Sequence, residues 1–239
     1  MTKLLFALAL LVTSRAHADD HAGDHHDADH HDADHHDADH HTTDEHHADS
    51  YAVAMQKEIT RLEAARAADE LEAISVAFAK LGDAEHQWLA YYYAALAEIR
   101  VAILYEAPMP NGDRIDPAVA KARALIGKAE AIEKNSELAV LTGMAIAAHI
   151  QVAPQSRWDE SARMQEALET ASHLDPGNPR AYLVKGELTL HGSEQFGGGK
   201  AKAQPLLDKA VELFKHAKVK PLYPSWGQHQ AEYLLTMSK

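Results

Sequence analysis

The chain has 239 residues, no cysteine, and 36 acidic against 23 basic residues, which gives a formal net charge of −13. The absence of cysteine excludes disulfides, catalytic thiolates and thiolate metal sites. The acidic balance excludes the basic surface that a nucleic-acid-binding protein needs. The sequence also contains no G-x-S-x-G, zincin or dinucleotide-binding motif, so we expect no catalytic residues and no enzyme.

The first 18 residues have the pattern of a secretory signal peptide. Lys3 is followed by the apolar run 4–12, which is too short to cross a bilayer, and then by the A-x-A cleavage pattern of 16–18. Cleavage would fall before Asp19. No later segment has the ~18 apolar residues that a membrane span requires. The sequence therefore predicts an exported protein of the periplasm.

Residues 19–49 form an acidic, histidine-rich segment with 12 acidic residues, 11 histidines and no Lys or Arg. The segment has no large apolar side chain, so it cannot offset the entropy of ordering and is expected to be disordered. Imidazole and carboxylate groups are ligands of Zn²⁺, Ni²⁺ and Cu²⁺, so we expect several exchangeable sites for Zn, Ni or Cu(II) here. An acidic spacer is the alternative, although a spacer has no need of paired histidines. The candidate ligands are His21, His25, His26, His30, His31, His35, His36, His40, His41, His46 and His47.

From residue 51 onward, Ala and Leu dominate and Gly and Pro cluster between helical stretches, which predicts an all-α domain over 51–239. Asp83 and the pairs Asp116-Pro117 and Asn178-Pro179 are predicted helix starts, because Asp and Asn cap helices and Pro suits the first helical position. The expected helices are 51–80 with a break near 67, 84–105, 117–134, 136–151, 156–174, 179–191, 200–216 and 228–237.

The segment ASHLDPGNPRAYLVKGELTL resembles the junction of two tetratricopeptide repeats. Ala171, Pro176, Tyr182 and Gly186 stand at the offsets of that pattern, and Gly143 occupies the same place in a degraded copy, KAEAIEKNSELAVLTGMAIA. Small residues at such positions let paired helices approach closely. The resemblance implies a right-handed stack of antiparallel helical hairpins, a TPR-like α-solenoid, with 228–237 as a C-terminal capping helix.

Repeat proteins of this kind usually bind other proteins, so we expect an exported scaffold for a protein or peptide partner, with no cofactor required for the fold. The resemblance implies a partner-binding surface that comes from the first helix of each hairpin. Its candidate residues are Val140, Met144, Leu183, Glu187 and Leu190. The alternative is a periplasmic metal buffer or metallochaperone, whose helical body docks an acceptor while the tail carries the metal.

Overall fold

The computed structural model describes residues 42–239, with side chains from residue 50 onward. The described part is all-α, as predicted: it contains nine α-helices, two short 3-10 helices and no strand. The predicted signal peptide and most of the predicted tail lie outside the described residues. The helices are α1 (Thr42–Ala64), α2 (Ala68–Glu85), α3 (Trp88–Leu104), α4 (Gly112–Glu130), α5 (Ser136–Val152), η1 (Trp158–Glu160), α6 (Ser161–Leu174), α7 (Pro179–His191), η2 (Glu194–Phe196), α8 (Lys200–His216) and α9 (Gln228–Ser238).

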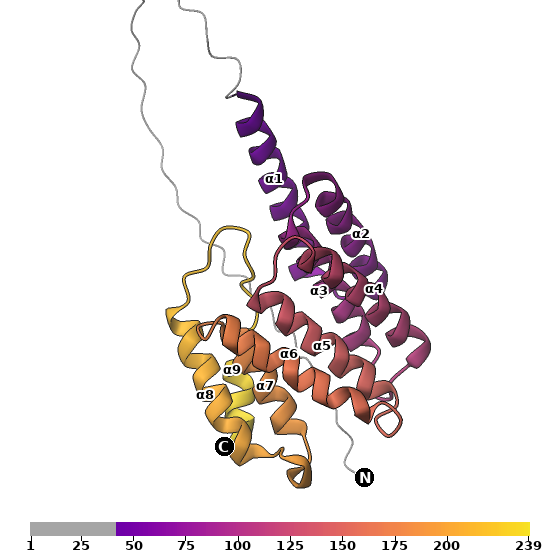
Figure 1. The fold of residues 1–239 in the computed structure, drawn as a ribbon, viewed down its shortest axis with the longest axis vertical. Coiled ribbons are helices and arrows are strands. Elements are labelled where there is room, and N and C mark those ends of the chain that lie inside the picture. Colours follow the sequence, from indigo (N-terminus) through magenta and orange to yellow (C-terminus); the bar gives the residue numbers. More distant parts are fainter. Residues whose placement is uncertain (1–41) are drawn as a thin grey trace, which may run out of the picture.

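Helices α3, α5 and α7 form a central row, in which α5 contacts both α3 and α7 (Figure 1). Each of them pairs with the helix that follows it, and α4 also packs on α5 and α6 on α7. Helix α2 packs on α3 at one end of the molecule, and α9 packs on α8 and α7 at the other. Residues far apart in the chain are thereby brought together along the α3–α5–α7 row.

Several predicted helix starts are confirmed and two are wrong. Asn178 caps α7, because its side-chain oxygen accepts a hydrogen bond from the Arg180 N–H at 2.9 Å. Asp83 does not start a helix: it lies in the last turn of α2, where its carboxylate accepts hydrogen bonds from Tyr91 and Lys128, both at 2.7 Å. Helix α4 begins at Gly112, which leaves Pro117 inside the helix rather than at its start.

The break predicted near residue 67 is present, between α1 and α2. Helix α1 starts at Thr42, which lies inside the segment predicted to be disordered and before the predicted domain start at 51. The helical domain therefore extends further toward the N-terminus than the apolar composition indicates.

A buried ion pair holds α5 against α7. The Arg180 guanidinium donates three hydrogen bonds of 2.8–3.0 Å to the Glu137 carboxylate, and one of 3.2 Å to the Trp226 carbonyl oxygen. The Trp226 indole N–H in turn donates to the hydroxyl of Tyr92, on α3, at 2.8 Å. These bonds link all three helices of the central row to the segment before α9.

Two glycines set the spacing within the helix pairs α5–α6 and α7–α8. A Cβ added at Gly143 would lie 2.6 Å from Leu168 of α6, and one added at Gly186 would lie 2.7 Å from Leu207 of α8. Both distances are far shorter than ordinary carbon–carbon contacts of about 3.5–4.0 Å. Only glycine therefore lets α5 and α7 approach their partners this closely. Of the other repeat-signature residues, Ala171 is buried, Tyr182 is half-buried and Pro176 is exposed in the turn before α7.

Candidate functional site

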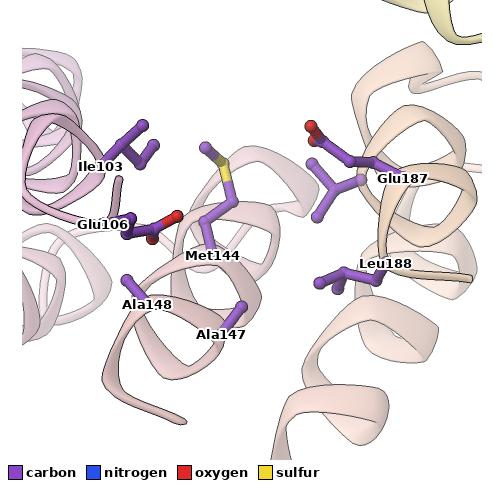
Figure 2. Close-up of a pocket in the computed structure, with 8 residues that line it drawn as sticks. Ile103, Glu106, Met144, Ala147, Ala148, Glu187 and Leu188 are labelled. Atoms are coloured by element: carbon purple, nitrogen blue, oxygen red, sulfur yellow. The ribbon is translucent and has the colours of Figure 1, made fainter. Parts of the chain in front are cut away.

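The described residues contain a pocket where the C-terminal halves of α3, α5 and α7 meet (Figure 2). It encloses about 340 Å³ of empty space, including the part open to solvent. Only about 30 Å³ of it is free for the centre of a water-sized sphere, which is far below the roughly 300–1,000 Å³ of sites that enclose a whole small molecule. The pocket can therefore seat one edge of a larger ligand. The lining is mostly apolar, and it consists of Ile103, Glu106, Met144, Ala147, Ala148, Val184, Glu187 and Leu188.

Small side chains on α5 create the space. Ala147 and Ala148 stand where α5 passes between the other two helices, and neither reaches far enough to fill the gap. Met144, one turn earlier on α5, stands in the middle of the pocket (Figure 2). Its unbranched, polarizable side chain can change rotamer to suit an apolar ligand. From α7, Val184, Glu187 and Leu188 line the pocket at i, i+3 and i+4 spacing, which places them on one helix face.

Glu187 is a buried acid within this apolar lining, with an exposed fraction of 3 %. Its Oε2 atom accepts a hydrogen bond of 3.0 Å from the side-chain amide of Gln230, on α9. Its Oε1 atom is buried and has no hydrogen-bond partner. Burial raises the pKa of Glu187 to about 7, although the bond from Gln230 acts in the opposite direction.

Glu106 faces Glu187 from the other side of the pocket. It follows the end of α3, where its backbone N–H donates to the Ile103 carbonyl oxygen at 3.2 Å and so continues the last helical turn. Figure 2 shows both carboxyl groups pointing toward Met144 from opposite sides. Glu106 is 7 % exposed, and its Oε2 atom is buried without a hydrogen-bond partner. Burial, and then the nearby Glu187, raise the pKa of Glu106 to about 8.

The predicted partner-binding residues divide between the pocket and the core. Met144 and Glu187 line the pocket. Val140 and Leu183 are fully buried and so present no surface to a partner, and Leu190 is half-buried against the cluster formed by α7, α8 and α9. The partner-binding surface predicted from the sequence does not include Glu106. The only signal for it in the sequence is an acid placed directly after a long apolar helix.

The predicted metal ligands lie almost entirely outside the described residues. His46 and His47 belong to α1, but their side chains are not described. Among the described side chains, no group of three or more His, Cys, Asp or Glu is arranged to hold a metal ion. Within the same part of the chain, no helix is both long and apolar enough to cross a membrane.

No protein-family model matches the chain. No curated protein matches it either. Among solved structures, the HusA haemophore from Porphyromonas gingivalis is similar, with a TM-score of 0.72 and 33% sequence identity, over 79% of this chain and 92% of that chain. The chain belongs to the family of this haemophore.

Membership of the HusA family corrects the sequence-based view of function. The predicted scaffold for a protein or peptide partner, and its alternative of a metal buffer or metallochaperone, are both wrong, because the relative is a haemophore. The predicted Zn, Ni or Cu(II) on the tail is likewise overturned by that relative. The error has a physical origin: the tail's composition is conspicuous in the sequence, whereas the pocket forms only when three distant helices pack together.

Proposed function

We propose that this chain binds haem in the pocket between α3, α5 and α7. The observation that carries the proposal is a mostly apolar pocket with two inward-pointing carboxyl groups, in a chain of the HusA haemophore family. Apolar lining suits the face of a porphyrin ring, and a few polar groups suit its propionate-bearing edge. Because the pocket is small and opens to solvent, it would hold one edge of the macrocycle, and most of the ring would lie outside the residues that line it.

Haem would be carried rather than transformed. The lining supplies apolar surface and two carboxyl groups, which would hold and orient one edge of a cargo. The signal peptide predicted from residues 1–18 would place the carrier outside the cytoplasm, where haem could be collected and passed to a protein partner such as a receptor. Export, the receptor and the lack of catalysis are parts of this proposal.

The pairs α5–α6 and α7–α8 support a finer proposal about the scaffold. In both pairs, a glycine on the first helix contacts a leucine on the second, at Gly143–Leu168 and Gly186–Leu207. We infer that these hairpins are equivalent units that stack in the manner of tetratricopeptide repeats. Stacking of this kind presents the first helix of every unit on one surface, which is where the pocket lies.

The test is a haem titration of the full chain, followed by the absorbance of the bound porphyrin. Replacing Ala147 by Phe places a ring inside the pocket, so haem affinity should fall about tenfold or more. The same substitution at Ala124, an exposed position on α4, is the matched control and should leave binding unchanged. Circular dichroism verifies that both variants fold. Equal haem affinity in the two variants would place the binding site elsewhere.

A further inference from the structure

The pocket holds two buried carboxyl oxygens that have no hydrogen-bond partner, Glu106 Oε2 and Glu187 Oε1. A buried polar atom without a partner costs about 1–3 kcal/mol, so native structures rarely retain one without a reason. Here one such atom comes from the turn after α3 and the other from α7, and both face the same cavity. Their shared orientation indicates that a ligand supplies the missing partners.

The surroundings of the two acids favour their neutral form. Burial disfavours a charged carboxylate, and two carboxylates facing one pocket repel each other. His191 stands one turn beyond Glu187 on α7 but does not line the pocket, and burial lowers its pKa, which favours the neutral imidazole. The other elements present uncharged groups: Met144, Ala147 and Ala148 from α5, and the amide of Gln230 from α9.

The hydrogen bond from Gln230 also determines which Glu187 oxygen carries the proton. The Gln230 amide donates to Oε2, so that oxygen acts as an acceptor. The acidic proton therefore belongs on Oε1, the oxygen that has no partner. A neutral Glu187 then directs an O–H donor into the pocket, as buried carboxylic acids do in other proteins where they stay neutral near pH 7.

We propose that Glu106 and Glu187 bind the ligand directly as carboxylic acids, each donating a hydrogen bond to an acceptor atom at the ligand's polar edge. The inference rests on the proposed haem-binding function and specifies the chemistry of that site. The acceptors that fit are carboxylate oxygens, such as the two propionates of haem. Hydrogen bonds from an acid to a carboxylate are short and strong, because the acceptor is charged. The pair would thus select macrocycles that carry acidic side groups.

Ionisation of the two acids reverses their role. Each carboxylate loses its donor and presents a negative charge to an anionic acceptor. Haem affinity should therefore fall as the pH rises from 6 to 9, by about tenfold or more, since a lost charged hydrogen bond changes a binding constant by roughly that factor. Glutamine keeps an N–H donor and cannot ionise, whereas leucine has a similar size but no donor.

The experiment compares haem titrations at pH 6, 7, 8 and 9 for the full chain and two double variants. Glu106→Gln/Glu187→Gln should bind like the wild type at pH 6 and retain that affinity at pH 9. Glu106→Leu/Glu187→Leu should bind about tenfold more weakly than the Gln variant at every pH. Glu166→Gln/Glu169→Gln makes the same substitution on the exposed face of α6 and should follow the wild type. At each pH, the haem affinity of a variant is divided by that of the wild type. The titration of haem itself affects both values equally and so cancels.

The outcomes separate this inference from the proposed function. A wild-type chain that binds no haem at any pH overturns the proposed function, and with it the inference. Binding whose pH dependence is the same in the wild type and the Gln variant overturns the inference alone. Wild-type affinity that rises with pH, together with loss of binding in the Gln variant, would mean that carboxylates accept hydrogen bonds or hold a cation, which also overturns it.

Discussion

The close approach of α7 to α8 makes Gly186→Leu the most demanding test of the packing. A Cβ at position 186 would lie 2.7 Å from Leu207 Cδ2 and 2.8 Å from Leu207 Cγ. Carbon atoms pack best at about 3.5–4.0 Å, so the contact is short by roughly 1 Å before the rest of the leucine is added. Leu207 is fully buried and cannot swing into solvent. The two helices must therefore separate.

Overpacking of this kind costs about 1–3 kcal/mol, and a whole leucine belongs at the upper end of that range. For a chain of this size, the midpoint of thermal unfolding should fall by roughly 6–12 °C. Gly127→Leu is the matched control, because Gly127 is exposed on α4 and a Cβ there meets nothing within 4 Å. That variant should gain about 0.5 kcal/mol, since leucine favours helix more than glycine does.

The assay is thermal unfolding followed by helical circular dichroism. Adding Leu207→Ala to Gly186→Leu removes the two nearest atoms, so the double variant should lose less stability than the sum of the two single changes. If Gly186→Leu and Gly127→Leu melt at the same temperature, glycine is not required for the helix contact and the reasoning fails.

Two further predictions concern buried charge. Glu137→Ala leaves the Arg180 guanidinium buried without its carboxylate. The free energy of unfolding, measured with denaturant, should therefore fall by on the order of 3–5 kcal/mol. A fall below about 1 kcal/mol would mean that water replaces the missing carboxylate. The ligand-free chain should lose stability as the pH rises from about 4.5 to 8, because folded Glu106 and Glu187 keep protons that the unfolded chain releases. Each acid contributes on the order of 3 kcal/mol to that loss of stability. The double Gln variant should not show the loss, so stability curves against pH that run parallel for the wild type and this variant would contradict the prediction.

Helices proved to be predictable wherever local chemistry determines them. Asn178-Pro179 supplies both a capping side chain and a residue suited to the first turn, and α7 begins there. Asp83 has the same local preference but accepts bonds from Tyr91 and Lys128, partners that only the folded chain brings near. A capping preference worth about 1 kcal/mol is readily outweighed by such contacts. A helix start predicted from a capping residue is therefore wrong where that residue forms hydrogen bonds to distant parts of the chain instead.

The pocket was less predictable than the helices, for a geometric reason. Glu187 could be selected because the resemblance to tetratricopeptide repeats places it on the surface formed by the first helix of each hairpin. Glu106 could not, because it precedes the segment APMPNG, whose Pro and Gly indicate an exposed loop. Its burial comes from α5 and α7, which pack over the end of α3. No local pattern marks a residue that becomes buried through packing by helices about 40 and 80 residues further along the chain.

The space itself has even less signature in the sequence. It exists because Ala147 and Ala148 are small where α5 passes between α3 and α7, and alanine is also the most favourable residue for any helix. An alanine chosen for helix stability and an alanine that leaves room for a ligand look identical in a sequence. The histidine-rich tail shows the opposite case, since its composition is obvious while its ligand is not. Under the proposed function, two acids within an apolar helix row, rather than the most unusual segment of the sequence, mark where this chain holds its ligand.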